Sequence, residues 1–336
     1  MDVVHVSLWA VTLLILLALA LDFSNSFQDA ADSIATVVST GALKPQQAVV
    51  FAAFMNFASM FVFGHHVAAT VATGIVEPGI VDHHVVIAAL IGAFAWHLVT
   101  WFLGIPSSPA HALAGGLVGA VLVKAGTSAL IGTGLWKLAA FILVSPALAF
   151  VVSSLLMVGV AWLFRGHSPR RVDGGFRHLQ LVSAGLYALG RGGNDAQRSI
   201  GIVWMLLITA GVVGTADPLP PIWATGLGYV VVALGTLLGG WRLVKTMGRK
   251  IAQLKPTGGF CADTGAAVTL FLVAALGVPV STAHTIAGAA AGAGSTRSMS
   301  AVRWHAVGRL VWAWVFAVPT AALIAAGGYG LARWLI

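Results

Sequence analysis

Acidic side chains within apolar segments are the first residues of this 336-residue sequence that could do chemistry. Asp22, Asp29, Asp32 and Asp195 lie within or against long apolar runs. A charge inside a membrane costs at least about 2.5–3.5 kcal/mol on insertion scales, so such a residue is usually paired, binds an ion or carries a proton. We expect Asp29 and Asp195 to hold a coupling ion or proton, with Asp32 as an accessory residue.

Two basic residues flank Asp195. Arg191 precedes it by one helical turn and Arg198 follows it by a similar distance, so a structural ion pair is the alternative to an ion-binding role. Arg191 is also an accessory candidate, because its charge is permanent. It could neutralise Asp195 or face a bound anion. We favour the second role, because Gly192 and Gly193 would let the backbone approach an anion.

Two short motifs carry hydroxyl groups next to proline. Ser107 and Ser108 follow one proline, and Ser281 and Thr282 follow a Pro-Val pair. A helix that begins at such a motif directs free N–H groups and the positive end of its dipole outward, which suits an anion. We expect these four residues to bind an oxyanion. Ordinary helix capping is the alternative.

His111 and His284 each stand three residues after a serine of these motifs. They are accessory candidates that could orient the loop by hydrogen bonding or titrate near neutral pH, and packing is an equal alternative. The histidine pairs at 65–66 and 83–84 have no acidic or cysteine partner at metal-ligand spacing. We therefore expect no metal site.

The composition indicates that a membrane surrounds most of the chain. Hydrophobic residues make up 59% of the sequence and charged residues only 8%, whereas soluble domains carry about 25% charged residues. The apolar run at 3–21 has no basic residue before it and no evident cleavage site, so we expect it to be retained. The single cysteine excludes an internal disulfide.

Long and short apolar segments alternate along the chain. Several are long enough to span a bilayer, which takes about 20 residues. The segments at 23–40, 104–124 and 277–296 are shorter and are broken by Gly, Pro or Asp, as in half-helices or re-entrant hairpins. The predicted fold class is an all-α integral membrane bundle with discontinuous or re-entrant helices.

The sequence also contains an internal repeat. GIPSSPAHALAGGLVGA (104–120) aligns with GVPVSTAHTIAGAAAGA (277–293), and QDAADSIA (28–35) aligns with NDAQRSIG (194–201). The two alignments occur in the same order at nearly equal offsets. We therefore predict a first membrane repeat at 1–164, a basic cytoplasmic linker at 165–178 and a second membrane repeat at 179–336.

The placement of positive charge predicts how the repeats are oriented. Only three of the eighteen Lys and Arg residues lie in 1–164. The others gather in short loops between apolar runs, which the positive-inside rule places in the cytoplasm. This pattern explains the net charge of +8 without nucleic-acid binding. Each half then crosses the membrane an odd number of times, so the repeats are inverted and both termini lie outside.

Four segments resemble the duplicated motifs of the PiT family of inorganic phosphate transporters. These are LDFSNSFQDAADSIATVVSTGAL (21–43), PSSPAHALAGGLVGA (106–120), GRGGNDAQRSIGIV (190–203) and PVSTAHTIAGAAAGAG (279–294). The segments at 241–267 and 300–319 also resemble the bacterial branch of this family. The resemblance implies a multi-pass protein of the inner (plasma) membrane that carries phosphate together with H⁺ or Na⁺. Some bacterial members carry a neutral complex of phosphate with a divalent metal. The resemblance implies no resident cofactor, and we leave a homodimer open.

By motif position, the resemblance places Asn25 and Asn194 in the substrate site beside Asp29 and Asp195. This chain departs from the family pattern at several positions, which leaves the coupling ion and the anion preference open. The family often has His at Gln28 and Asn at Asp32, usually has His at Arg191, and usually has hydroxyl residues at Pro109, Ala110 and Ala283.

Three other functions are alternatives to phosphate transport. A sulfate or other oxyanion permease would use the same fold, but a carboxylate that accepts a proton favours phosphate, which still carries one. A passive anion channel needs neither the acidic pair nor the inverted repeat. A membrane enzyme is disfavoured, because no HExxH or GxSxG motif is present.

Overall fold

The computed structural model describes residues 8–103, 108–214, 217, 219–247 and 254–335. Within them the chain forms helices and no extended strand, which confirms the predicted all-α class. The α-helices are α1 (Leu8–Gln28), α2 (Ala30–Ser39), α3 (Pro45–Ala58), α4 (His66–Ala69), α5 (His83–Leu103), α6 (Pro109–Ala125), α7 (Gly132–Leu163), α8 (Pro169–Thr209), α9 (Ile222–Met247), α10 (Pro256–Ala275), α11 (Thr282–Ser295) and α12 (Trp304–Leu335). Five short helical turns connect them, η1 (Ser59–Phe61), η2 (Thr70–Gly74), η3 (Pro78–Ile80), η4 (Thr127–Ala129) and η5 (Met299–Ala301).

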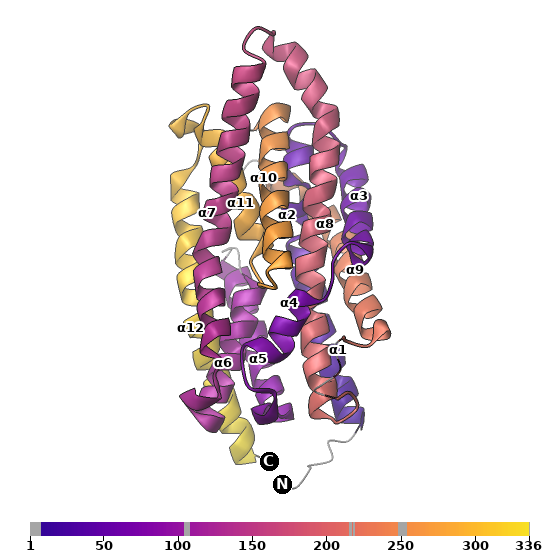
Figure 1. Cartoon of the computed structure of the whole chain (residues 1–336), viewed down its shortest axis with the longest axis vertical. Coiled ribbons are helices and arrows are strands. Elements are labelled where there is room, and N and C mark those ends of the chain that lie inside the picture. Colours follow the sequence, from indigo (N-terminus) through magenta and orange to yellow (C-terminus); the bar gives the residue numbers. More distant parts are fainter. Residues whose placement is uncertain (1–7, 104–107, 215–216, 218, 248–253, 336) are drawn as a thin grey trace.

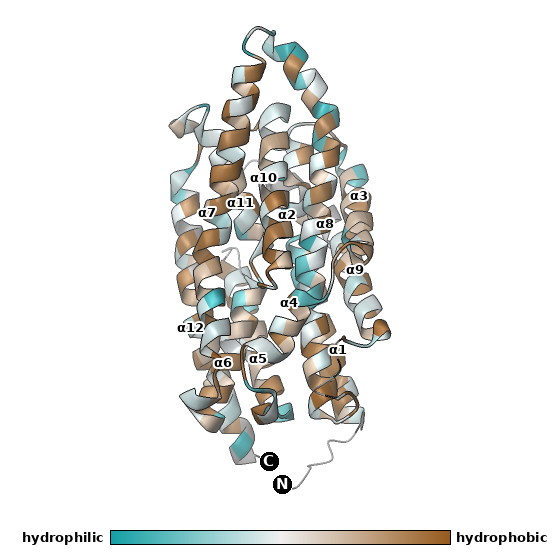
Figure 2. Ribbon diagram, viewed as in Figure 1, coloured by the Kyte–Doolittle hydropathy of each residue, from teal (hydrophilic) through white to brown (hydrophobic). Residues whose placement is uncertain are grey.

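The helices form an elongated bundle (Figure 1), and hydrophobic residues occur along the length of its helices (Figure 2). Six helical segments of the described chain are long and apolar enough to cross a membrane, or seven if the bent pair α3–η1 and α4–η2 counts as one span. Large apolar side chains point outward, and Phe102 is 81% and Trp136 75% exposed. Such side chains are stable in contact with lipid tails. The chain is therefore a multi-pass membrane protein.

The element order recurs in the two halves of the chain. The series α5, α6, η4 and α7 matches α10, α11, η5 and α12. Helices α7 and α12 both contain 32 residues, and their internal prolines, Pro146 and Pro319, are separated by the same offset as Ser108 and Ser281. In Figure 1, α7 runs upward whereas α12 runs downward, as inverted repeats require.

The two half-helices pack on helices of the opposite repeat. Helix α6 lies against α12, and α11 lies against α7. Glycines allow these close approaches, because a Cβ atom at Gly119 would overlap the main-chain oxygen of Ala322, and one at Gly292 would overlap that of Phe150. The exchange of half-helices ties the repeats into one bundle and brings the N-termini of α6 and α11 to its centre.

The basic segment between the repeats is mostly helical. We predicted a loop over 165–178, but α8 begins at Pro169, a residue that suits the first turn of a helix. Helices α7 and α8 extend together beyond the rest of the bundle at the upper end in Figure 1. The start of α10 lies at the same end, because Thr257 Oγ1 donates to Asp173 Oδ1 at 2.6 Å.

An ion pair marks the opposite end of the bundle. Lys124 Nζ donates to Asp82 Oδ2 at 2.5 Å, and the N–H of Val85 donates to Asp82 Oδ1 at 2.9 Å. Partial burial opposes ionisation of Asp82, but the Lys124 ammonium and the Val85 N–H outweigh it and hold the pKa of Asp82 below its usual value.

Candidate functional site

The N-termini of α6 and α11 meet at the centre of the bundle. Ser108 caps α6 and Ser281 caps α11, and each hydroxyl accepts the main-chain N–H of the histidine three residues later at 3.4 Å. The rings of His111 and His284 lie 5.7 Å apart, one from each repeat. The two predicted hydroxyl motifs therefore face each other. Ser107 lies outside the described residues.

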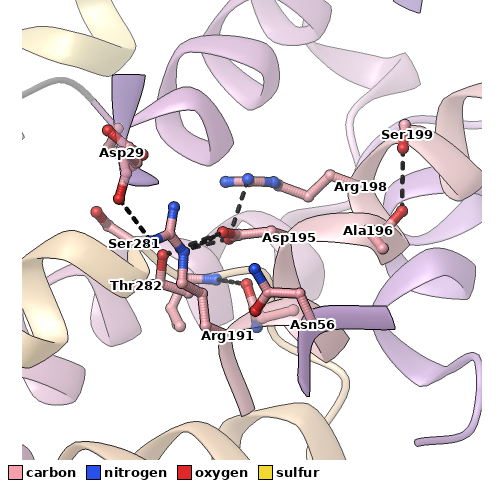
Figure 3. Close-up of polar contacts among 12 residues, drawn as sticks. Asp29, Asn56, Arg191, Asp195, Ala196, Arg198, Ser199, Ser281 and Thr282 are labelled. Atoms are coloured by element: carbon pink, nitrogen blue, oxygen red, sulfur yellow. Dashed lines mark hydrogen bonds and ion pairs between the residues drawn. The ribbon is translucent and has the colours of Figure 1, made fainter. Parts of the chain in front are cut away.

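Asp195 lies beside this meeting point and is held by two arginines (Figure 3). Arg191 Nε donates to Oδ2, and Arg198 Nη2 forms an ion pair with Oδ1, both at 3.0 Å. The Thr282 hydroxyl approaches the same carboxylate at 3.3 and 3.4 Å. All four side chains are buried, and Asp195 is only 2% exposed. The structural ion pair, which is the alternative to an ion-binding role for Asp195, is therefore present and involves both arginines.

Arg191 also reaches the first repeat. Its Nη1 donates to the main-chain oxygen of Asp29 at 2.6 Å and to the Ser33 hydroxyl. The expected backbone cradle at Gly192 and Gly193 is wrong, because α8 continues through both without a break. A Cβ atom at Gly192 would meet the backbone of Asn56, so this glycine permits helix packing instead of ligand approach.

Asp29 occupies the break between α1 and α2. It is half-buried, and its main-chain N–H donates to the oxygen of Asn25 at 2.8 Å. Among the described residues, no hydrogen bond or ion pair is found for the Asp29 carboxylate. Asp32 lies close by in the first turn of α2. The repeat makes Asp29 and Asp195 equivalent in sequence, but within the described residues only the carboxylate of Asp195 forms ion pairs.

The two asparagines predicted for the site have different environments. Asn194 is fully buried and fixes the segment before α11, because its amide donates to Val278 O and accepts from the Val280 N–H, both at 3.3 Å. Asn25 is 2% exposed, and neither amide atom has a hydrogen-bond partner within the part of the chain that the structure describes. Buried amides are normally paired, which marks Asn25 as a position where a ligand could bind.

Sequence reasoning missed several buried polar residues. Arg198 was considered only as a partner for Asp195, and Ser33 only as part of the repeat. Asp263 was missed altogether, although it is fully buried on α10. It accepts from Gln180 Nε2 at 3.4 Å, and Gln180 Oε1 accepts from the Thr40 hydroxyl at 2.7 Å. Its position just before the apolar run 264–277 could have revealed it.

A small cavity separates Arg198 from the half-helices. Its volume is about 10 Å³, and its lining includes Ala110 at the start of α6, Pro279 just before α11, and Arg198. That volume corresponds to about one water molecule. Within the described residues, no group of three or more His, Cys, Asp or Glu side chains could hold a metal ion. The arrangement combines two helix N-termini with a buried guanidinium, which are suited to an oxyanion.

Comparisons with known proteins agree with this architecture. The sequence pattern of the phosphate transporter family matches residues 25–325. A probable low-affinity inorganic phosphate transporter of Rhizobium meliloti is 54% identical, over 93% of each chain. One from Bacillus subtilis is 38% identical, over 94% of this chain and 95% of its own.

A solved structure extends the agreement to the fold. The structure of a sodium-dependent phosphate transporter superposes with a TM-score of 0.90 at 25% identity, over 98% of this chain and 100% of the other. The resemblance found in the sequence motifs and the prediction of a transporter instead of an enzyme are thus confirmed. The chain belongs to the phosphate transporter family.

Proposed function

We propose that this protein is a secondary active symporter that takes up inorganic phosphate with H⁺ or Na⁺ by alternating access. The meeting of two serine-capped helix N-termini, one from each repeat, next to buried Arg198 carries the proposal. Phosphate oxygens are good acceptors for N–H groups at helix N-termini and for guanidinium groups. The relatives named as phosphate transporters support phosphate over other oxyanions.

The substrate would be held by residues of both repeats. Ser108 and Ser281 would direct their hydroxyls toward phosphate, together with main-chain N–H groups of the first turns of α6 and α11. Thr282 would add a third hydroxyl. Asn25 would supply its unpartnered amide. Asn194 would act by holding the segment before α11 in place, since its amide is already engaged there.

Asp29 is the better candidate for the coupling ion or proton. Its carboxylate lies at a helix break, and no hydrogen bond or ion pair of this carboxylate is found among the described residues, so it is available to a cation or a proton. Asp195 is already neutralised by two guanidinium groups and would instead form the scaffold of the site. The sodium-dependent solved neighbour favours Na⁺ as the first ion to test. A neutral metal–phosphate complex is the other form of cargo that we propose to test.

Transport requires the repeats to move. The cavity beside Arg198 holds about one water-sized volume, far less than a phosphate ion needs. We propose that 1–164 and 179–336 rock against each other, with 165–178 joining them in the cytoplasm. The exchanged half-helices α6 and α11 would carry the site through this movement, since each packs on the other repeat.

Uptake into proteoliposomes tests the function. A Na⁺ gradient and a pH gradient are imposed separately, and radiolabelled phosphate should accumulate above its external concentration only under the gradient of the coupled ion. Repeating the assay with Mg²⁺ or with a chelator would separate free from metal-bound phosphate. Ser281→Ala and Ser108→Ala should each weaken phosphate affinity. Uptake that stops at equilibrium would instead indicate a channel, and stronger inhibition by sulfate than by phosphate would indicate a sulfate permease.

A further inference from the structure

The guanidinium of Arg191 lies among oxygen atoms that would suit a small cation. It contacts a carboxylate oxygen of Asp195, the main-chain oxygen of Asp29 and the hydroxyl of Ser33. Carboxylate, carbonyl and hydroxyl oxygens are the ligands of hard cations, and main-chain carbonyls at broken helices coordinate Na⁺ in transporters. The Asp29 carbonyl belongs to such a break, between α1 and α2.

These oxygen atoms come from both repeats. Asp29 and Ser33 belong to the first repeat, and Asp195 belongs to the second. Arg191 is 1% exposed and cannot lose its proton at physiological pH. A permanent positive charge is therefore fixed where the two repeats meet.

The surroundings of Arg191 are acidic. Two carboxylates act on it, Asp29 from the break between α1 and α2 and Asp195 from α8, and Asp32 lies close to Asp29. Tyr187 lies one turn away on α8, and its hydroxyl has no partner among the described residues. Two other charged groups lie in this region. Arg198 forms an ion pair with the second carboxylate oxygen of Asp195, and Asp263 on α10 interacts electrostatically with Tyr187. Without the Arg191 charge, this acidic environment would attract a cation.

The equivalent position in the first repeat carries no charge. The alignment that pairs Asp29 with Asp195 pairs Asn25 with Arg191, and Asn25 is a neutral amide without a hydrogen-bond partner in the described structure. Only the second repeat thus supplies its own cation. The backbone differs as well, because the chain breaks between α1 and α2 at Asp29 whereas α8 is continuous at Asp195.

We propose that Arg191 is a tethered cation that fills an ion site formed by the main-chain oxygen of Asp29, the hydroxyl of Ser33 and a carboxylate oxygen of Asp195, and that the Asp29 carboxylate lies outside this site. The protein then needs no free cation at this position, so each phosphate travels with one cation fewer than in a relative whose residue there is neutral. The lower number of cations per phosphate rests on the proposed symport, but the ion site itself can be tested without transport.

Sodium binding to purified protein tests the site. Arg191→Gln removes the charge and keeps a polar side chain, and Arg191→Lys keeps the charge as a matched control. With radioactive sodium, at ionic strength held constant with choline, Arg191→Gln should bind about one more Na⁺ per chain than wild type, because one monovalent charge replaces another. Its thermal midpoint should rise with Na⁺ in a saturable manner, and that of Arg191→Lys should not.

Arg191→His provides a second test should the glutamine variant not fold. The imidazole is charged at about pH 5 and neutral at about pH 8. The extra Na⁺ should therefore bind only at the higher pH, after subtraction of the wild-type change over the same range. Equal sodium binding by folded wild type and Arg191→Gln, or no pH difference in Arg191→His, would overturn the proposal.

The outcomes also separate this inference from the proposed function. Extra sodium binding by Arg191→Gln supports the ion site even if wild-type protein fails to accumulate phosphate. Weaker phosphate binding in the variants with unchanged sodium binding would show that Arg191 contacts the anion, and would overturn the inference while leaving phosphate transport intact.

Discussion

The asymmetry between the two matched aspartates leads to a prediction about stability and transport together. Asp195→Asn and Asp29→Asn remove the same charge at equivalent positions of the repeat. We expect both variants to lose uptake of phosphate against a gradient, because each aspartate lies at the proposed site. Only Asp195→Asn should also destabilise the protein, because only that carboxylate holds two buried guanidinium groups.

The expected magnitude follows from burial. Removing one partner of a buried ion pair typically costs about 3–5 kcal/mol, because an uncompensated charge remains. Arg191 and Arg198 have side chains that are 1% and 4% exposed, so water cannot replace the lost carboxylate. Asparagine could still accept one hydrogen bond, worth about 1 kcal/mol, so the net loss should be at least about 2–3 kcal/mol. Asp29→Asn leaves the main-chain contact to Arg191 intact and should cost about 1 kcal/mol or less.

Thermal unfolding of purified protein in detergent would measure this difference. Size-exclusion chromatography after heating gives the midpoint for each variant, and radiolabelled phosphate uptake in proteoliposomes gives the function. Asp195→Asn should show the lower midpoint by a clear margin, with Asp29→Asn close to wild type. Equal midpoints for the two variants would refute the reasoning, as would near-normal concentrative uptake by both.

Three further predictions concern other parts of the molecule. Gly119→Ala should greatly reduce the yield of folded protein because its Cβ would overlap helix α12, whereas Gly159→Ala, which has open space around it, should behave as wild type in fluorescence-detected size exclusion. The pKa of Asp82 is lower in the folded than in the unfolded protein, so ionised Asp82 stabilises the fold above the unfolded pKa of about 3.9, and this contribution is lost as the pH falls through the folded pKa. Asp82→Asn should remove this acid-dependent part of the stability from thermal midpoints measured between about pH 3 and 7. Identical pH profiles for wild type and variant would contradict the prediction. In a Cys261→Ala background, Arg170→Cys and Lys137→Cys should react with a membrane-impermeant thiol reagent from opposite sides of the membrane, Arg170→Cys from the cytoplasm. Reaction of both variants from the same side would exclude the predicted cytoplasmic position of the linker.

Much of the fold could be predicted from the chain itself. The low charge content required a membrane, and the apolar segments required helices, because a lipid-exposed backbone must satisfy its own hydrogen bonds. The two hydroxyl motifs next to proline predicted where α6 and α11 begin, because a proline near a helix start and a hydroxyl cap favour a helix start through neighbouring residues alone. The boundaries were less well predicted. The basic segment 165–178 is mostly helix, because charged residues outside the membrane can continue a helix as readily as a loop.

The sequence by itself determined which residue types lie inside the membrane and that they occur in two related sets, because the cost of burying a charge and the periodicity of a duplication are both written along the chain. It indicated Arg191 and Arg198 as ion-pair partners for Asp195, but it could not determine which contacts these charges make with the other repeat. Asp29 and Asp195 are equivalent in the alignment, and only the tertiary structure places Arg191 across the repeat boundary, against Asp195 on one side and the carbonyl of Asp29 on the other. The ion pairs of Asp195 are local to α8, whereas the contact of Arg191 with the main-chain oxygen of Asp29 joins residues far apart in sequence and is set by the packing of α8 against α1 and α2.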